Sequence, residues 1–193
     1  AALPMKQRIT VLGSTGSIGV NTLEVIRRFP DRFAVSGMAA GSNLPLLRKQ
    51  IEAFKPGVVS VLSEDLARGL KKMLPGKRKP EIVYGTDGPG LIASDSNADM
   101  VVSAIVGAAG LMPTLKAITC GKQVALANKE TLVMAGKIIM REARRRRVII
   151  LPIDSEHSAL FQLMRRQQDR KPRAIILTAS GGPFLGYSRN RLA

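Results

Sequence analysis

The sequence has few cysteine residues and few aromatic residues. Its 193 residues include one cysteine, Cys120, no tryptophan and only 4% aromatic residues. A single cysteine excludes a disulfide within the chain and fits a reducing compartment. A core with so few rings must be built from aliphatic side chains and methionine. Such a core suits a parallel β-sheet that is buried on both faces.

Long apolar runs are also missing. No stretch reaches the roughly 18 consecutive apolar residues that indicate a membrane-spanning helix. The first five residues, AALPM, have neither the charged segment nor the apolar block of a signal peptide. We therefore expect no membrane partner and a cytoplasmic location.

Acidic residues are scarce. There are 14 Asp and Glu against 30 Lys and Arg, which gives a net charge of +16. The basic residues gather at 71–72, 77–79, 144–147 and 165–173. Nucleic-acid binding is one interpretation of such runs, but no aromatic residues are interleaved with them. Solvated helix ends and loops are the favoured interpretation, so no nucleic-acid partner is expected. A positive field also suits a phosphorylated substrate and cofactor.

Glycine is plentiful near the start, in Gly13-Ser14-Thr15-Gly16-Ser17-Ile18-Gly19. The β-branched run at 8–12 precedes it as a predicted strand, and an amphipathic helix is predicted at 20–28. A strand, a glycine turn and a helix open a dinucleotide-binding βαβ unit, in which the helix N-terminus binds phosphates. The spacing G-x-x-G-x-x-G differs from the usual G-x-G-x-x-G, and a plain turn is the alternative.

The end of the second predicted strand, 33–40, bears on cofactor choice. An NAD site places an Asp or Glu there to accept from the ribose 2′-hydroxyl. This sequence has Gly41-Ser42-Asn43 instead, followed by Arg48 and Lys49. A neutral loop with cations nearby favours the 2′-phosphate of NADP. Ser42 and Asn43 could also cap the next helix, and both roles can hold together.

Strands and helices alternate through most of the chain. Further strands are expected at 58–62, 81–84, 98–105, 121–127, 148–153 and 173–178, and further helices at 44–54, 63–73, 86–93, 113–120, from 131 to the arginine run, and at 158–166. The alternation predicts an α/β fold with a Rossmann-like, doubly wound parallel sheet to about residue 147, followed by an incomplete α+β region.

Polar clusters follow two of the later strands. Asn128-Lys129-Glu130 lies at a strand's carboxyl end, where open α/β sheets bind ligands, although a helix start with a solvated charge pair explains it equally well. Ser180-Gly181-Gly182 could offer a hydroxyl and N–H groups to a phosphate, or form only a tight turn.

Asp154-Ser155-Glu156-His157 follows the strand at 148–153. In extended chain, carboxylates two positions apart point the same way, and a hard divalent ion such as Mg²⁺ or Mn²⁺ is their natural partner. The alternative is that these acids and Ser155 cap the next helix. His157, the only histidine, is as compatible with packing as with a role as a base.

Five motifs in this order resemble those of the 1-deoxy-D-xylulose 5-phosphate reductoisomerase family of the non-mevalonate isoprenoid pathway. They are Gly-Ser-Thr-Gly-Ser-Ile-Gly at 13–19, Ala-Ile-Val-Gly-Ala-Ala-Gly-Leu at 104–111, Leu-Ala-Asn-Lys-Glu at 126–130, Pro-Ile-Asp-Ser-Glu-His at 152–157 and Ser-Gly-Gly-Pro-Phe at 180–184. The resemblance implies an NADPH- and divalent-metal-dependent enzyme that rearranges and reduces its phosphorylated sugar substrate to 2-C-methyl-D-erythritol 4-phosphate. It also implies a homodimer, and a plastid location if the organism is a plant.

The resemblance implies roles for individual residues. The implied NADPH contacts are Thr15, Gly16, Ser17, Ile18, Gly41, Ser42, Asn43, Asn128 and Glu130. Asp154 and Glu156 would hold the Mg²⁺ or Mn²⁺ ion, and Lys129, Ser155, Glu156 and Ser180 would bind substrate. Lys129 and Glu156 are the implied catalytic residues. The family often has Lys where this chain has Ser42, so this contact to the 2′-phosphate is weaker here.

One departure from the family is large. Its catalytic domain continues well past the Ser-Gly-Gly-Pro-Phe turn and supplies a third metal carboxylate and a substrate-binding histidine. This sequence has no Glu after Glu156 and no histidine after His157. The expected division is therefore an NADPH-binding domain at 5–147 and the beginning of a catalytic, metal-binding domain at 148–193. This chain alone is expected to be inactive through truncation.

Two other functions stay open on the sequence. An NADP-dependent reductase similar to semialdehyde or homoserine dehydrogenases shares the glycine-rich loop but needs no metal pair at Asp154 and Glu156. A basic nucleic-acid-binding protein would account for the net charge alone.

Overall fold

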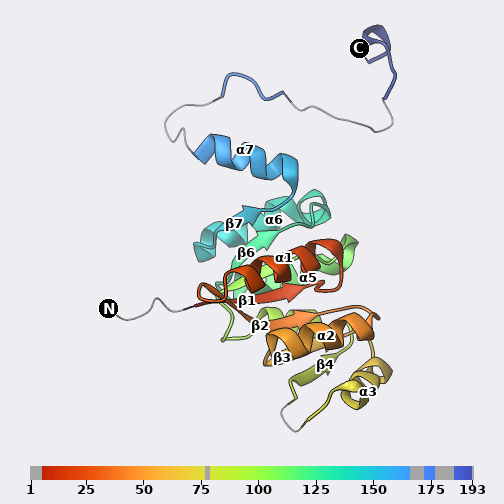
Figure 1. Cartoon of the computed structure of the whole chain (residues 1–193). Coiled ribbons are helices and arrows are strands. Elements are labelled where there is room, and N and C mark those ends of the chain that lie inside the picture. The colour runs from red at the N-terminus through yellow and green to blue at the C-terminus, as the bar shows by residue number, and fades with distance from the viewer. Residues whose placement is uncertain (1–5, 77–78, 166–171, 177–184, 193) are drawn as a thin grey trace. The chain divides into compact units, whose positions relative to one another are not determined.

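The computed structural model describes residues 6–76, 79–165, 172–176 and 185–192 (Figure 1). The chain forms two compact units, 1–154 and 155–193. The predicted Ser180 site falls outside the described residues.

The first unit is built on one parallel sheet of seven strands in the order β4-β3-β2-β1-β5-β6-β7. The strands are β1 (Gln7–Leu12), β2 (Phe33–Ala39), β3 (Val58–Val61), β4 (Glu81–Tyr84), β5 (Met100–Ser103), β6 (Gln123–Leu126) and β7 (Ile150–Pro152). From β1 the chain runs outward to β4, then returns to β5 on the other side of β1 and runs outward to β7. The strand order therefore reverses between β1 and β5, which confirms the predicted doubly wound fold.

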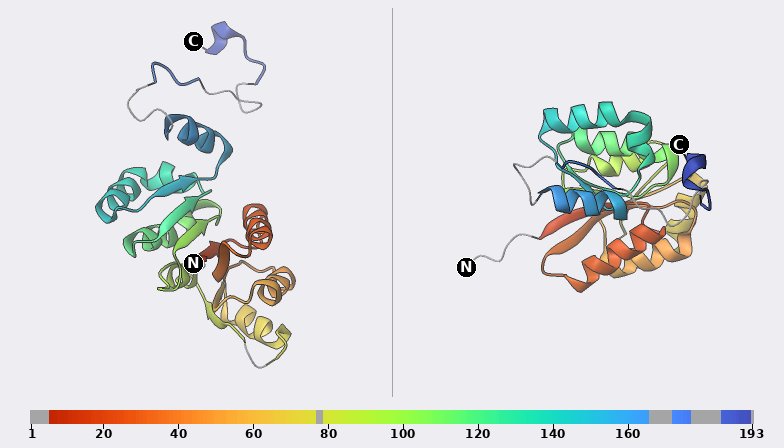
Figure 2. Two further views of the ribbon diagram at one scale, coloured as in Figure 1. Left: turned by 60° about the vertical axis from the view of Figure 1, so that its left-hand side comes forward. Right: turned by 90° about the horizontal axis from the view of Figure 1, so that it is seen from above.

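Helices cover both faces of this sheet (Figure 2). One buried cluster joins the strands to α1 (Ser17–Arg28), α2 (Leu44–Phe54) and α3 (Glu64–Met73), and a second joins them to α4 (Gly88–Ala93), α5 (Leu111–Thr119) and α6 (Glu130–Arg146). Adjacent β1 residues divide between the two clusters, with Val11 in the first and Leu12 in the second. This alternation explains why the central strands are apolar along their whole length.

Local signals in the sequence fix several helix ends. The Asn43 side chain accepts a hydrogen bond from the N–H of Leu46 at 3.2 Å, and Ser63 accepts from Leu66 at 3.3 Å. These are N-caps of α2 and α3, so the capping role predicted for Asn43 is confirmed. α6 is kinked at Ala135, where φ is −140°.

Strand β7 follows the predicted domain boundary at residue 147, yet it is part of the same sheet. Its Leu151 is in register with Ala125 of β6. The division into an NADPH-binding domain up to 147 and a catalytic domain from 148 stays a prediction. The sheet itself continues to Pro152.

The second unit contains α7 (Ser155–Arg165) and the short helix α8 (Arg189–Leu192). The predicted strand at 173–178 is wrong for the residues described there. Residues 173–176 are exposed and carry no strand assignment, and Ile176 is 87% exposed. A β-branched run becomes a strand only when a neighbouring strand pairs with its backbone groups, and the described part of the chain supplies none here.

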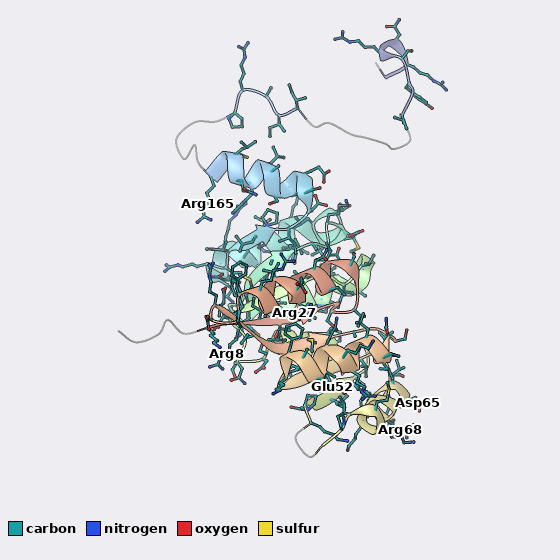
Figure 3. All side chains as sticks on the ribbon, in the orientation of Figure 1. Arg8, Arg27, Glu52, Asp65, Arg68 and Arg165 are labelled. Atoms are coloured by element: carbon teal, nitrogen blue, oxygen red, sulfur yellow. The ribbon has the colours of Figure 1, made fainter. Side chains whose placement is uncertain are left out.

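Several basic side chains of the first unit pair with acids on their own helix. Figure 3 labels Arg27 on α1, Glu52 on α2, and Asp65 with Arg68 on α3. Arg68 lies 2.6 Å from Asp65, and its side chain is 63% exposed. Exposed pairs of this kind are typical of solvated helix surfaces.

Within the described residues, no helix combines the length and the apolar character needed to cross a membrane.

Candidate functional site

The predicted site residues of the first unit line up along one edge of the sheet. The glycine-rich turn follows β1, residues 41–43 follow β2, 104–107 follow β5, 128–130 follow β6, and Asp154 follows β7. These five strands are neighbours in the order β2-β1-β5-β6-β7, and all run in the same direction. Their carboxyl ends therefore form one continuous edge that contains the reversal of strand order, which is where open α/β sheets bind ligands.

The glycine-rich turn is held tightly between β2 and α1. The N–H groups of Gly13 and Ser14 donate to the Ala39 carbonyl at 2.9 and 2.8 Å. Gly13 has φ +84°, and a Cβ there would lie 2.6 Å from the Ala104 carbonyl oxygen. A Cβ on Gly19 would lie 2.6 Å from Ser14 Cα. Both positions therefore require glycine.

The start of α1 is open to a ligand. Gly16 is its N-cap residue and provides no side-chain hydrogen bond, and no acid lies in the first turn. Gly16, Ser17 and Ile18 are exposed, and Thr15 is half-buried. The first N–H groups of a helix carry partial positive charge and attract anions. The turn thus has the geometry of a phosphate-binding site.

The sequence interpretation missed Gln50, which supports this turn from α2. Gln50 is 6% exposed, and its Nε2 donates to the Ser14 carbonyl at 2.8 Å. A signal was present, because Gln50 lies between Leu47 and Ile51 on the apolar side of the predicted helix. A polar residue in that stripe is expected to have a buried partner.

The loop that follows β2, residues 40–43, contains no Asp or Glu. Gly41 is half-buried, whereas Ser42 and Asn43 are exposed. The Asn43 side-chain oxygen is engaged as the cap of α2. A direct contact of these three residues with a 2′-phosphate stays a prediction.

Asn128 is buried at the end of β6, with 4% of its surface exposed. Its Nδ2 donates to the carbonyls of Ile105 and Gly107, the latter at 2.9 Å. Its Oδ1 accepts from the N–H of Thr131 at 3.1 Å. The side chain therefore ties the loop after β5 to the start of α6.

Lys129 and Asp154 form an ion pair, with Lys129 Nζ 3.3 Å from Asp154 Oδ2. The lysine side chain is 60% exposed and the aspartate side chain 15% exposed. The pair links the residues that follow the carboxyl ends of β6 and β7. The resemblance implies that Lys129 binds substrate and that Asp154 binds the metal ion. Glu130, the next residue, is exposed in the first turn of α6.

The predicted metal ligands fall in separate units. Asp154 is the last residue of the first unit, and Glu156 lies in the first turn of α7 in the second. In the second unit, Ser155 Oγ donates to Glu156 Oε2 at 2.7 Å. The described residues contain no group of three or more His, Cys, Asp and Glu that could hold a metal. Both carboxylates are nevertheless hard oxygen donors of the kind that Mg²⁺ and Mn²⁺ prefer, so the residue types fit the ion.

Comparison with known families gives two successive matches. The 1-deoxy-D-xylulose 5-phosphate reductoisomerase family matches residues 9–136, and the C-terminal domain of the same family matches residues 150–193. The chain belongs to this family. The first match begins within β1 and covers β2 to β6 with their loops.

Individual relatives agree with this assignment. The 1-deoxy-D-xylulose 5-phosphate reductoisomerase of Geobacter metallireducens is 56% identical over 189 residues, which cover 97% of this chain and 48% of the relative. The enzyme from Zymomonas mobilis, solved in complex with NADPH, superposes with a TM-score of 0.87 at 40% identity, over 95% of this chain and 48% of that one. A reductoisomerase solved with fosmidomycin and magnesium has a TM-score of 0.84 at 36% identity, over 96% and 49% of the two chains.

The chain thus spans about half the length of the curated relatives it matches. These matches support the reductoisomerase interpretation and give no support to the dehydrogenase-like or nucleic-acid-binding alternatives.

Proposed function

We propose that this chain provides the NADPH-binding part, and the first part of the catalytic region, of an enzyme that converts 1-deoxy-D-xylulose 5-phosphate to 2-C-methyl-D-erythritol 4-phosphate. The observation that carries the proposal is the single edge formed by the carboxyl ends of β2, β1, β5, β6 and β7. On that edge lie a helix N-terminus suited to phosphate, a loop without a carboxylate, and an exposed lysine beside an aspartate. The relatives solved with NADPH, and with fosmidomycin and magnesium, support it.

NADPH would extend along this edge from β2 towards β6. Its phosphates would bind at Thr15, Gly16, Ser17 and Ile18, where the helix N-terminus offers N–H donors. The 2′-phosphate would lie at residues 41–43, where no carboxylate repels it. The nicotinamide half would then lie over the ends of β5 and β6, near Asn128 and Glu130.

The residues at the β6 and β7 ends would handle the substrate. Asp154 and Glu156 would hold a divalent cation through their carboxylate oxygens. When bound, the cation supplies Lewis-acid polarisation of substrate oxygens, and NADPH supplies the hydride. Lys129, Ser155 and Ser180 would bind and orient the substrate. Because the Lys129 side chain is 60% exposed, its ammonium could leave Asp154 and turn towards an anionic oxygen of the substrate.

The test follows the absorbance of NADPH during incubation with 1-deoxy-D-xylulose 5-phosphate and Mg²⁺ or Mn²⁺. A protein of full family length that contains this sequence is expected to oxidise NADPH only when substrate and cation are both present. The 193-residue chain by itself is expected to bind NADPH with undetectable or greatly reduced turnover. Oxidation that persists in a chelator would instead favour a metal-independent reductase.

A homodimer remains a prediction from the resemblance, and a cytoplasmic location remains a prediction from the sequence. Light scattering of the full-length protein would measure its mass, and a monomeric mass would contradict the first. Fractionation of the source cells would test the second.

A further inference from the structure

Every polar atom of the Asn128 side chain already has a protein partner. A side-chain amide has two N–H donors and one carbonyl oxygen, which can accept up to two hydrogen bonds. The donors reach the carbonyls of Ile105 and Gly107, and the acceptor receives the N–H of Thr131. The residue is also 4% exposed. A hydrogen bond donated by this side chain to a cofactor would require one of the two buried Nδ2 bonds to break.

The two carbonyls that Asn128 holds lie on either side of Val106. That side chain is 83% exposed, although it is apolar. Gly107 has φ +71°, and a Cβ on Gly110 would contact Asn128 Nδ2 and lie 2.8 Å from the Ile105 carbonyl oxygen. The loop is therefore packed closely against the asparagine, and it leaves Val106 pointing into solvent.

The same loop contacts the glycine-rich turn on its other side. The Ala104 carbonyl oxygen would lie 2.6 Å from a Cβ on Gly13. The segment 104–107 is thus held between the phosphate-binding turn of β1 and the asparagine of β6. A displacement of this segment would change the surface next to the turn.

We propose that Asn128 is a positioning residue, whose side chain holds residues 105–107 so that Val106 presents an apolar surface to the nicotinamide half of NADPH. The proposal rests on the proposed function, because it takes NADPH as the ligand of this edge. It differs from the role that the resemblance implied for Asn128, a contact with the cofactor. The adenosine half would bind at β1 and β2, away from Val106, so only one half of the cofactor depends on this loop.

Asn128→Asp is the sharpest variant. Aspartate keeps the size of the side chain and the acceptor for Thr131, but its second oxygen would face the Ile105 and Gly107 carbonyls with no proton to share. Asn97→Asp is the matched control, since it makes the same change of charge on an exposed loop before β5, at the opposite end of that strand. Val106→Thr keeps the side-chain shape at an exposed position and therefore tests the apolar surface without disturbing the core.

Two ligands are titrated into each variant: NADPH, and adenosine 2′,5′-bisphosphate, which lacks the nicotinamide half. We expect Asn128→Asp and Val106→Thr to weaken NADPH binding by roughly tenfold or more, and adenosine 2′,5′-bisphosphate binding by less than about twofold. Asn97→Asp is expected to change neither. Unchanged NADPH affinity in Asn128→Asp, or equal weakening of both ligands, would overturn the proposal.

Hydrogen exchange in the free protein separates a positioning role from direct contact. Amides of residues 104–110 are expected to exchange faster in Asn128→Asp than in the unchanged chain and in Asn97→Asp. Unaltered exchange together with weaker NADPH binding would indicate a direct contact and refute the proposal. If the unchanged chain binds no NADPH, the proposed function fails, whereas the exchange measurement still decides whether Asn128 holds the loop.

Discussion

Replacing Gly19 with alanine tests whether α1 must pack directly on the glycine-rich turn. Gly19 is buried in the first turns of α1. A Cβ there would meet the Gly13 carbonyl oxygen and would lie 2.6 and 2.7 Å from Ser14 Cα and its carbonyl carbon. All three atoms belong to the backbone, so no flexible side chain can move away. The helix or the turn must shift instead.

Two opposing effects set the size of the change. Alanine stabilises a helix interior by about 1 kcal/mol relative to glycine. Overpacking a well-packed contact costs about 1–3 kcal/mol, and the upper part of this range applies because backbone must move. We therefore expect Gly19→Ala to lower the free energy of unfolding by about 2 kcal/mol and the melting temperature by about 4–8 °C. NADPH binding is expected to weaken as well, since the shifted turn carries the phosphate site.

Gly90→Ala is the matched control. Gly90 lies in the helix α4, and a Cβ there would meet nothing within 4 Å. This variant is expected to melt at an unchanged or slightly higher temperature, because only the propensity effect remains. Thermal unfolding followed by circular dichroism compares the three proteins. If Gly19→Ala melts no lower than the unchanged chain, the close packing of α1 on the turn is wrong.

Two further variants test other contacts along this edge. Gln50→Leu keeps a similar volume but removes the donor to the Ser14 carbonyl. We therefore expect urea titration to show a free energy of unfolding lower by about 1–3 kcal/mol. A decrease below about 0.5 kcal/mol would mean that Gln50 does not support the turn. Lys129→Ala breaks an ion pair in which the lysine is 60% exposed, so stability is expected to change by less than about 1 kcal/mol. In the full-length protein the same variant is expected to weaken substrate binding, measured by calorimetry. Unchanged affinity would mean that Lys129 does not bind the substrate.

The order of strands and helices was predictable because its signals are local. The helix at 44–54 shows its apolar stripe and its cap within a dozen residues, and the structure places α2 at those bounds. The strand at 8–12 is a β-branched run that ends at a glycine turn, and β1 covers it. Such signals act between neighbours in the sequence, so they can be seen without the fold.

The contacts that shape the site could not be predicted in this way. Gln50 lies 36 positions from Ser14, and Asn128 lies 21 to 23 positions from the carbonyls it holds. Nothing in either short segment indicates its partner, because the partners meet only when β6 pairs with β5 and α2 packs on the sheet.

The error at 173–176 has a related cause. The run Ala-Ile-Ile-Leu has the composition of a strand, but strand formation depends on a neighbour that composition does not specify. For Asp154, the motif indicated a candidate functional residue but did not indicate its partner. Its ion pair with Lys129 forms because β6 and β7 are neighbours in the sheet.

Titration of the 193-residue chain with NADPH and with NADH in a calorimeter tests whether this sheet edge is an NADP-type dinucleotide site. We predict saturable binding of one NADPH per chain and clearly weaker binding of NADH, because residues 41–43 offer no carboxylate to the ribose of NADH. An absence of NADPH binding, or NADH binding of equal or greater affinity, would mean that this edge is not an NADP site.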